Sequence, residues 1–339
     1  MGTAQSEADV VVSVEGLRTY FYNDNRCNKA VDDVSFEIRS GKTLCVVGES
    51  GCGKSVTASS IMQLLPRLAR IEEGSITFNA QSGALRIDKL DRNGRAMRNI
   101  RGGEIAMIFQ DPMKSLNPVY TVGFQIAENL KYHTRLASRA IRELTIEMLG
   151  KMGIPLPEKR VDQYPHEFSG GMRQRAMIAM AMACNPRLLI ADEPTTALDV
   201  TIQAQIFETM LKLKAEHGTA IMLITHDMGV VAELADEVAV MYMGKIVEGG
   251  TVEEVLRTPR HPYTKALLAS IPVLGRGRNQ QIEPIRGSTP DPYDRPVGCQ
   301  FAPRCDYAGE KCAVMPDEEY VSFTHRVRCW KHQEVAPDE

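Results

Sequence analysis

Four short apolar runs predict the strands of a parallel sheet. They cover residues 44–47, 105–109, 188–191 and 220–224, and each is followed by a glycine or a polar residue. Apolar runs of this length are typical of parallel strands that are covered on both faces. Between them lie longer segments with a helical pattern, at residues 56–65, 122–152, 172–184 and 202–216. The alternation of strands and helices indicates an α/β protein.

The first 80 residues carry a second kind of pattern. Valine, isoleucine, threonine and aromatic residues gather at residues 10–14, 17–22, 34–38 and 74–78, and glycines or polar residues separate these runs. Such runs are typical of antiparallel strands. An antiparallel β region is therefore expected in addition to the parallel sheet, and the helical segment 122–152 is expected to be an insertion.

Length and composition fit two domains, or one large domain with an appendage. The chain has 339 residues, of which 43% are hydrophobic and 24% charged, and its formal charge is −3. This charge argues against bulk nucleic-acid binding. No apolar run reaches the roughly 18 residues of a membrane span, and the first ten residues do not resemble a signal peptide. A cytoplasmic protein is expected.

A phosphate-binding loop follows the first apolar run. Its residues fit the spacing G-x-x-x-x-G-K-[ST] and are Gly48, Glu49, Ser50, Gly51, Cys52, Gly53, Lys54 and Ser55. Glycines allow backbone N–H groups to approach phosphate oxygens, and the next helix presents its N-terminal N–H groups to the same anion. Lys54 is placed to reach the β- and γ-phosphates and the Ser55 hydroxyl to bind Mg²⁺. The loop predicts a nucleoside triphosphate as the ligand.

A second phosphate-binding surface is expected at residues 169–171. Ser169 is a natural N-cap for the predicted helix 172–184, and Gly170 and Gly171 expose backbone N–H groups at its start. This surface is far from the first loop in the sequence. It is useful only if it covers the nucleotide from the opposite side, in a second copy or a related subunit.

Polar residues at the ends of the predicted core strands complete the candidate site. Asp192 and Glu193 follow the run 188–191, and His226 follows the run 220–224. Ligands of α/β sheets lie at the carboxyl ends of the strands. Asp192 is placed to hold the Mg²⁺ shell beside Ser55, and Glu193 to polarise an attacking water.

Together these motifs resemble the ATP-binding subunits of ABC transporters over essentially the whole chain. The resemblance identifies residues 48–55 as Walker A, and Asp192 with Glu193 as the end of Walker B and the catalytic glutamate. Gln110 is similar to the Q-loop glutamine, which implies roles in catalysis and in the Mg²⁺ site. Asp199 is similar to the D-loop aspartate and His226 to the switch histidine.

Two further motifs of the family are matched less closely. Ser169, Gly170 and Gly171 match the signature motif, although Phe168 and Met172 depart from the common L-S-G-G-Q. Among three consecutive aromatic residues, Phe21 best fits the A-loop aromatic that stacks on adenine. The resemblance implies a RecA-like core, an antiparallel β subdomain and a helical subdomain at about residues 111–183. It also implies that two cassettes, head to tail, bury two ATP molecules.

A narrower resemblance is to the peptide and nickel importer subfamily. The Q-loop segment 110–118 and the segment 261–268 are similar to its characteristic sequences. The resemblance implies a nucleotide-binding domain at residues 1–255 and a C-terminal extension at 256–339. It further implies two permease subunits, a second ATP-binding subunit, a solute-binding protein acting through the complex, and a peripheral location on the cytoplasmic face of the cell membrane. Nucleic acid is not an expected partner.

Two other classes of protein remain as alternatives. A P-loop kinase or GTPase acting alone would not need the segment 169–171. A soluble ABC ATPase acting on nucleic acid or ribosomes usually carries two cassettes or a long coiled coil, and this chain shows one cassette and no coiled coil. ATP hydrolysis coupled to the import of a peptide or related solute is therefore the preferred interpretation.

Four cysteines near the C-terminus form a separate candidate site. Cys299, Cys305, Cys312 and Cys329 have the spacing C-x5-C-x6-C-x16-C, without the C-x2-C of zinc ribbons or the ferredoxin run. The segment around them is poor in apolar residues, so a cross-link is expected. Members of the subfamily with a similar G-C-x-F-x-x-R-C segment hold a [4Fe–4S] cluster, which the resemblance implies here. Zinc, or free or disulfide-linked thiols, are the alternatives.

Overall fold

The computed structural model describes residues 9–23, 26–110, 115–195, 200–270 and 285–335. The chain divides into two compact units, and each unit collects segments from several parts of the sequence. Unit 1 comprises residues 1–13, 37–43 and 77–224, and unit 2 comprises residues 14–36, 44–76 and 225–339. Long stretches of three strands lie in both units: β1 (Val10–Asn23), β2 (Arg26–Arg39) and β4 (Ala69–Ala80). One terminal residue of β3 (Thr43–Val47) and one of β8 (Ala220–Thr225) also fall in the other unit.

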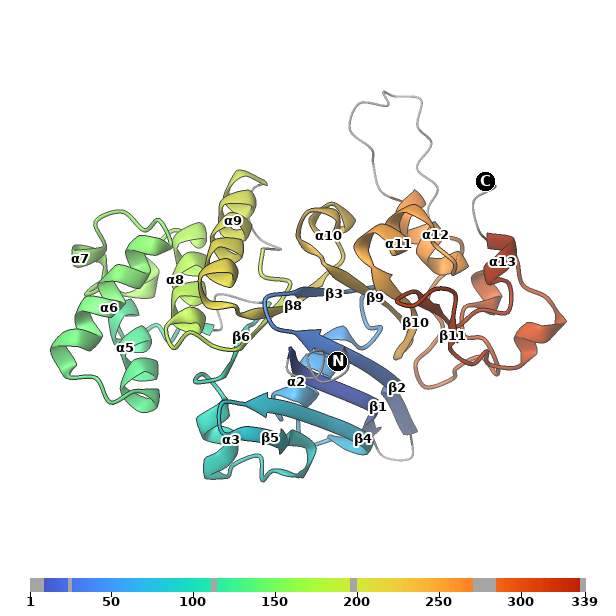
Figure 1. Ribbon diagram of the computed structural model, residues 1–339, viewed down its shortest axis with the longest axis horizontal. Coiled ribbons are helices and arrows are strands. Elements are labelled where there is room, and N and C mark those ends of the chain that lie inside the picture. Colours follow the sequence, from blue (N-terminus) through green and yellow to red (C-terminus); the bar gives the residue numbers. More distant parts are fainter. Residues whose placement is uncertain (1–8, 24–25, 111–114, 196–199, 271–284, 336–339) are drawn as a thin grey trace, which may run out of the picture. The chain divides into compact units, whose positions relative to one another are not determined.

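The core of unit 1 is a set of parallel strands (Figure 1). They are β6 (Ile105–Ile108), β7 (Leu188–Asp192) and β8 (Ala220–Thr225). β7 pairs in parallel with β6 on one side and with β8 on the other, and both β7 and β8 are buried along their whole length. The prediction of buried parallel strands from the apolar runs is confirmed. Because the strands are in register, Asp192 and the residues after β6 lie at the same edge.

Helices make up most of the remainder of unit 1. Before β7 in the sequence lie α5 (Val122–His133), α6 (Ser138–Lys151) and α8 (Gly170–Met182). The short α7 (Pro157–Arg160) and η2 (Pro165–Glu167) lie between α6 and α8. α9 (Val200–His217) lies between β7 and β8 in the sequence. Before β6 come β5 (Gly83–Arg86), which pairs with β4 in antiparallel fashion, η1 (Ile87–Lys89) and α3 (Arg95–Ile100).

The predicted helical segment 122–152 is two helices rather than one. Thr134 ends α5, because its backbone N–H and its hydroxyl both donate to the carbonyl of Leu130. α6 begins four residues later. The buried residues Val122, Ile126 and Leu130 form one face of α5, at the four-residue spacing of a helix that packs on one side. α5 packs against both α6 and α8.

Unit 2 carries the phosphate-binding loop and the C-terminal segment. β3 (Thr43–Val47) pairs in parallel with β9 (Glu237–Tyr242), which pairs in antiparallel fashion with β10 (Lys245–Thr251). The sheet continues through β12 (Arg326–Val327) to β11 (Glu319–Tyr320). The other elements of unit 2 are α2 (Lys54–Ile61), α10 (Met228–Leu234), α11 (Val252–Arg257), α12 (Pro262–Ala269), η4 (Ala302–Arg304), η5 (Glu310–Ala313) and α13 (His332–Val335).

Two sequence boundaries differ from expectation. The predicted strands 10–14 and 17–22 are one strand, β1, because Gly16 adopts a φ of 55° within it and donates its N–H to the Ser35 hydroxyl at 2.8 Å. The predicted helix 56–65 is displaced towards the N-terminus, since α2 begins at Lys54 and ends at Ile61. Among the residues that the structure describes, none of the helices has the length and hydropathy needed to cross a bilayer.

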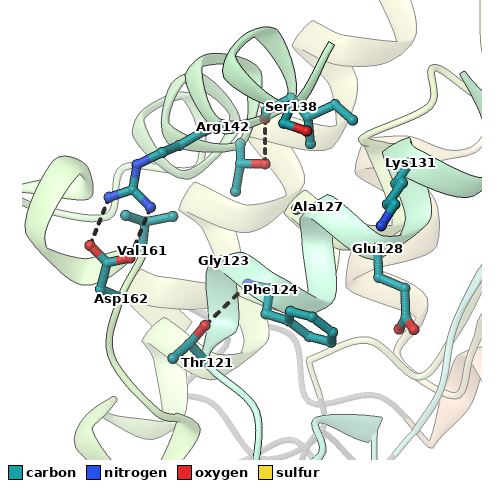
Figure 2. A pocket seen from close by; sticks show the side chains of 12 residues that line it. Thr121, Gly123, Phe124, Ala127, Glu128, Lys131, Ser138, Arg142, Val161 and Asp162 are labelled. Atoms are coloured by element: carbon teal, nitrogen blue, oxygen red, sulfur yellow. Dashed lines mark hydrogen bonds and ion pairs between the residues drawn. The ribbon is translucent and has the colours of Figure 1, made fainter. Parts of the chain in front are cut away.

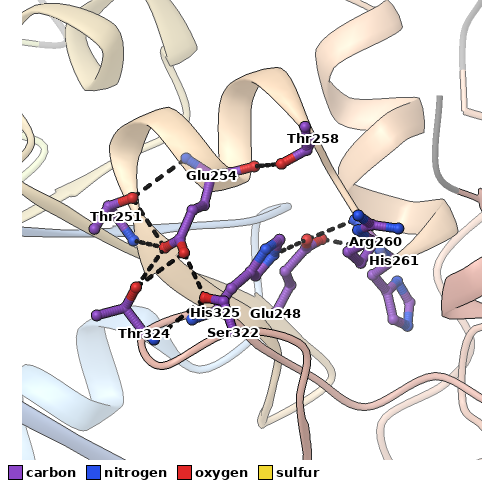
Figure 3. Close-up of polar contacts among 9 residues, drawn as sticks. All are labelled: Glu248, Thr251, Glu254, Thr258, Arg260, His261, Ser322, Thr324 and His325. Carbon is purple, nitrogen blue, oxygen red and sulfur yellow. Dashed lines mark hydrogen bonds and ion pairs between the residues drawn. The ribbon is translucent and has the colours of Figure 1, made fainter. Parts of the chain in front are cut away.

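Buried polar contacts join the C-terminal segment to β10 (Figure 3). The Glu248 carboxylate is fully buried and lies 2.7 Å from His325 Nε2. It also accepts hydrogen bonds from the backbone N–H groups of Arg260 and His261, at 2.6 and 3.0 Å. A buried carboxylate is costly unless it is paired and hydrogen-bonded. Three contacts from later residues meet this need.

Glu254, in the first turn of α11, makes a second set of contacts with the C-terminal segment. It forms a capping box with Thr251 at the start of α11, and its carboxylate accepts hydrogen bonds from the hydroxyls of Ser322 and Thr324 at 2.6 and 2.9 Å. Partial burial favours the neutral acid, but the hydrogen bonds from Ser322, Thr251 and Thr324 outweigh it and lower the pKa of Glu254 to about 2. The carboxylate therefore stays ionised and bound at neutral pH.

Candidate functional site

Backbone geometry requires glycine at both ends of the loop 48–53. Gly48 has a φ of 151° and Gly53 a φ of 109°. A Cβ atom at Gly48 would lie 2.2 Å from the Met241 carbonyl oxygen, and one at Gly53 would lie 2.2 Å from the Ala30 carbonyl oxygen. Neither position has room for a side chain. The glycines let the chain turn tightly from β3 into α2, which leaves N–H groups free to face an anion.

Lys54 is buried at the start of α2. Its ammonium donates to the carbonyl oxygens of Gly48 at 2.7 Å and Glu49 at 2.9 Å, and it lies 3.7 Å from Cys52 Sγ. These contacts hold the cation inside the loop, where a phosphate would be bound. Burial raises the pKa of Cys52, so its thiol stays neutral beside the lysine. Ser50 and Gly51 lie between these residues, and Ser55 is exposed in the first turn of α2.

Phe21 differs from its two aromatic neighbours in β1. The Tyr20 hydroxyl donates to Asp32, and the Tyr22 hydroxyl donates to Glu72. Side chains alternate along a strand, so Phe21 points to the opposite face from both tyrosines. Its partial exposure is compatible with stacking on a flat ligand, and its role as the adenine-stacking residue stays a prediction.

The structure brings Gln110 and Glu193 together in unit 1. Gln110 follows β6 and Glu193 follows β7, and Gln110 Nε2 donates to Glu193 Oε2 at 2.8 Å. Glu193 has a φ of 46°, which costs on the order of 1–3 kcal/mol for a residue other than glycine. Its N–H donates to the Ile224 carbonyl at 2.9 Å and fixes this turn. Asp192 precedes it at the buried end of β7.

The signature residues lie at the N-terminus of α8. The prediction that Ser169 caps this helix is confirmed, because its hydroxyl accepts a hydrogen bond from the Met172 N–H. Nothing lies within 4 Å of a Cβ built at Gly170, whereas one at Gly171 would touch Ile202. Phe168 is buried, which explains why an apolar residue stands there. The helix therefore presents free N–H groups at an open surface.

His226 is exposed after β8 and is held by the turn that follows it. The Asp227 N–H donates to the Thr225 hydroxyl at 3.0 Å, and Asp227 caps α10 by accepting from the Gly229 N–H at 2.8 Å. Phe21, residues 48–55 and His226 belong to unit 2, whereas Gln110, residues 169–171, Asp192 and Glu193 belong to unit 1. Asp199 and residues 111–114 lie outside the described residues.

The four C-terminal cysteines gather in unit 2. Cys299 donates its N–H to the Cys312 carbonyl at 2.9 Å, and all four thiols are free. Burial, and secondarily the neighbouring cysteines, raise the pKa of Cys305 to about 11 and that of Cys329 to about 12. Within the described residues, no three His, Cys, Asp or Glu side chains are arranged as ligands of a metal ion.

A pocket of about 420 Å³ lies between α5 and α6 (Figure 2). Phe124 lines it with 49% of its surface exposed, and its ring stacks on Tyr120 at 4.8 Å between centroids. Arg142 and Asp162 lie on one side, joined by two hydrogen bonds of 2.9 and 2.7 Å. Glu128 and Lys131 lie on the other side in this view.

The loop before α5 is pinned in place. The buried side chain of Gln125 accepts a hydrogen bond from the Asn117 N–H at 2.8 Å and donates to the carbonyls of Asn117 and Tyr120. This loop presents Val119, which is 71% exposed, and Tyr120, whose ring stacks on the pocket-lining Phe124. The hydrogen bonds of Gln125 therefore hold two exposed side chains, Val119 and Tyr120, in a fixed position.

Comparisons with known proteins place the chain in a family. Residues 31–196 match the family described as ABC transporter, and residues 247–312 match the oligopeptide/dipeptide transporter C-terminal region. A Brucella ovis protein named for ATP binding in peptide import is 51% identical over 96% of this chain and 98% of its own. The dipeptide transport ATP-binding protein DppD of Haemophilus influenzae is 47% identical over 94% of each chain.

A solved structure supports the same assignment. It is a dimeric ATP-binding cassette in a post-hydrolysis state bound to ADP and Pi, and it is 25% identical with a TM-score of 0.62. The match covers 71% of this chain and 98% of the other. The chain belongs to the ABC transporter ATP-binding proteins, which are P-loop ATPases. Within that class, its relatives over nearly the full length are ATP-binding subunits of peptide importers.

Residues that contact the phosphate loop from the C-terminal segment were missed by sequence reasoning. The Glu49 carboxylate binds Arg304, and its N–H donates to the Tyr263 hydroxyl. Both partners lie within the segments that resemble the peptide importer subfamily. Nothing in their spacing points to a residue more than 200 positions earlier. The available signal was an arginine next to a cysteine, in the segment 298–305 that resembles the subfamily.

Proposed function

We propose that this chain hydrolyses ATP to drive the import of a peptide or related small solute through an ABC permease complex. The observation that carries the proposal is the Gln110–Glu193 pair at the ends of adjacent parallel strands, in a chain whose phosphate loop demands glycine at both ends. The relatives' names supply the direction of transport and the class of solute. The kinase and nucleic-acid alternatives are not favoured by these relatives.

The residues divide the chemistry between them. Residues 48–55 bind the phosphates, and Lys54 supplies the cation that meets their charge. Ser55, Asp192 and Gln110 offer the oxygen ligands that suit Mg²⁺, which neutralises charge on the phosphates when bound. Glu193 accepts a proton from the attacking water, while Gln110 and His226 orient the reacting groups. Phe21 stacks on the base.

A second cassette completes each site. The N-terminus of α8, with Ser169, Gly170 and Gly171, binds the γ-phosphate held by the Walker A loop of the partner cassette. Asp199, which is outside the described residues, is assigned to the same junction by its resemblance to the D-loop aspartate. The dimeric relative supports this arrangement. In this proposal residues 1–255 form the cassette, with a helical subdomain at about 111–183, and residues 256–339 form the extension. The complex contains two permeases and receives solute from a binding protein, so the chain lies on the cytoplasmic face of the membrane.

Reconstitution tests this proposal directly. The chain is purified together with its two permease subunits and placed in proteoliposomes with the solute-binding protein. We expect uptake of a di- or oligopeptide only with ATP, and ATP hydrolysis that rises when solute and binding protein are present. The proposal would be contradicted if the rate of ATP hydrolysis were the same with and without the permeases, or if RNA or ribosomes raised it instead.

The pocket between α5 and α6 is proposed as the permease contact. It can take one or two large apolar side chains, and the charged residues on its rim can orient an amphipathic helix laid across it. The pinned loop at Val119 and Tyr120 extends this surface. We propose that residues 111–118 face the permease together with this pocket, although residues 111–114 lie outside the described part of the chain.

Replacing Phe124 with aspartate is expected to lower solute uptake by about tenfold or more, because a charge would be buried at the contact. The same variant should hydrolyse ATP as the isolated subunit at the wild-type rate. Tyr132→Asp is the matched control, since Tyr132 is an exposed aromatic residue of α5 outside the pocket. Equal transport by both variants would rule out this surface.

We further propose that Cys299, Cys305, Cys312 and Cys329 hold a [4Fe–4S] cluster with a structural role. Four thiols lie within residues 299–329, and those of Cys299, Cys305 and Cys312 are close enough to Cys329 to contribute to its raised pKa. They supply the ligand type and number that such a cluster needs. Their side chains would have to turn towards a common centre, since no such centre is formed by the described side chains. When bound, the cluster would cross-link the extension, and no step of ATP hydrolysis passes through it.

Anaerobic purification tests the cluster. The protein is expected to be brown, with broad absorption near ~400 nm and about four irons per chain. Cys305→Ser should lower both, whereas Cys184→Ser, a cysteine of unit 1, should leave them unchanged. Colourless protein without iron or sulfide would refute the cluster, and bound zinc in its place would identify a zinc site.

A further inference from the structure

Residues of the C-terminal segment bind Glu49, the second residue of the phosphate loop. The Glu49 carboxylate receives both guanidinium nitrogens of Arg304, with Nη1–Oε2 at 2.6 Å and Nη2–Oε1 at 2.9 Å. The Thr289 hydroxyl lies 3.2 Å from the same carboxylate. The Glu49 backbone N–H donates to the Tyr263 hydroxyl at 2.8 Å. Residues 214 to 255 positions away therefore hold both the side chain and the backbone of Glu49.

Arg304 is held in place before it meets Glu49. It is 5% exposed, and its Nε donates to the Arg286 carbonyl at 2.9 Å. Nη2 reaches the Gly287 carbonyl at 3.4 Å, and Nη1 reaches the Tyr242 hydroxyl at 3.4 Å. A two-pronged contact from a fixed, buried guanidinium is geometrically specific, unlike a surface ion pair. It lowers the pKa of Glu49, which keeps the carboxylate charged.

Tyr263 is equally fixed. Its side chain is fully buried and packs on Tyr242 and Phe301, with ring centroids 4.7 and 5.3 Å away. Tyr242 and Phe301 also pack on each other at 5.3 Å. Burial raises the pKa of Tyr263, so the hydroxyl stays neutral and accepts the Glu49 N–H. The contacts among these three rings pack β9, α12 and the start of η4 together, and Tyr263 connects them to the loop.

These contacts matter because a nucleoside triphosphate carries several negative charges. A carboxylate within the loop that binds it would repel it, unless a fixed cation neutralises that carboxylate. We propose that Arg304 and Tyr263 are positioning residues of the nucleotide site: Arg304 cancels the charge of Glu49, and Tyr263 fixes the first peptide of the loop. The extension thereby sets the affinity of the loop for nucleotide. This inference rests on the proposed role of residues 48–55 in binding ATP.

If Arg304 acts by neutralising Glu49, the effects of replacing the two residues should cancel, which a purely structural contact does not predict. In Arg304→Met the Glu49 carboxylate is left unpaired, and we expect the affinity for Mg-ATP to fall by about tenfold, the equivalent of about 1.4 kcal/mol. Glu49→Gln removes the repelling charge and should bind Mg-ATP at least as tightly as the wild type. The double variant should return to within about threefold of the wild type, because neither charge remains.

The measurement is the dissociation constant of a fluorescent ATP analogue and of its ADP counterpart for the full-length protein. The weakening in Arg304→Met should be larger for ATP than for ADP, since ATP carries more charge. Arg286→Met is the matched control, because Arg286 is an exposed cation of the same segment that pairs with Asp306. It should bind both nucleotides as the wild type does.

Several results would overturn the inference. Wild-type affinity in Arg304→Met would do so, as would a double variant as weak as Arg304→Met, which would make the contact purely structural. If Arg304→Met does not fold, the affinities of Arg304→Lys and Glu49→Gln for Mg-ATP are measured instead. Weaker binding by Glu49→Gln than by the wild type would contradict the proposal that the Glu49 charge repels the nucleotide. If the wild type itself does not bind the ATP analogue, the proposed function fails instead.

Tyr263→Phe tests the backbone contact separately. It removes one hydroxyl and keeps the packed ring, so we expect the KM for ATP to rise several-fold while kcat changes by less than about twofold, as for an interaction made equally in the ground and transition states. A loss of kcat at unchanged KM would exclude Tyr263 from positioning the loop for binding.

Discussion

Replacing Glu193 with glutamine is expected to slow ATP hydrolysis by about 10²- to 10⁴-fold, the range for removal of a positioned general base. Glutamine keeps the size of the side chain and can still bond to Gln110, which lies 2.8 Å from the carboxylate. It cannot accept a proton from water. Binding of ATP should be preserved, because the phosphates are proposed to bind to the loop 48–55, which belongs to unit 2.

Two measurements check this expectation. Phosphate release gives the turnover, and sizing chromatography with ATP and Mg²⁺ shows whether the variant stays in a closed dimer. Glu158→Gln is the control, because Glu158 is an exposed acid of the same unit, in α7. Hydrolysis by Glu193→Gln at the wild-type rate would show that another residue is the base.

A methyl group at Gly53 is expected to lower the free energy of unfolding by about 3–5 kcal/mol and to abolish nucleotide binding. Strain at a φ of 109° and a contact of 2.2 Å with the Ala30 carbonyl oxygen both oppose it. Because that oxygen belongs to the backbone, it cannot move aside cheaply. Denaturant unfolding measures the loss of stability.

Gly51→Ala separates the two causes. Gly51 also has a positive φ, 80°, but nothing lies within 4 Å of a Cβ built on it. Strain alone should cost about 1–2 kcal/mol there. If Gly51→Ala and Gly53→Ala are equally destabilised, steric contact with Ala30 is not the reason that glycine is required.

The parts of the site that follow a local rule could be predicted from the sequence. The apolar run before Asp192 is a buried parallel strand, and Ser169 caps α8, because burial on both faces and the needs of a helix N-terminus leave local marks. The sequence gives only a weak indication that α5 ends at Thr134. A threonine within a helical pattern does not reveal that its hydroxyl will bond to Leu130.

Contacts between distant segments could not be predicted in this way. Arg304 meets Glu49 only because the whole of unit 2 is folded, and an arginine and a glutamate in two loops have no periodicity that pairs them. The two-residue strands β11 and β12 are likewise too short to carry an alternating pattern. Glu248 reads as a polar residue of an ordinary strand, yet it is completely buried.

The junction at β10 limits how such proteins can be recombined. Glu248 and Glu254 precede the expected domain boundary at residue 255, but the side chains that bind them, from Ser322, Thr324 and His325, belong to the extension. A chimera that joins this cassette to an extension without these side chains would leave the buried Glu248 carboxylate without His325, at a cost of several kcal/mol for a buried pair broken on one side. Glu254, which is only partly buried, would keep its bonds to Thr251 and lose those to Ser322 and Thr324. The two acids and the segment 322–325 must therefore be exchanged as one block.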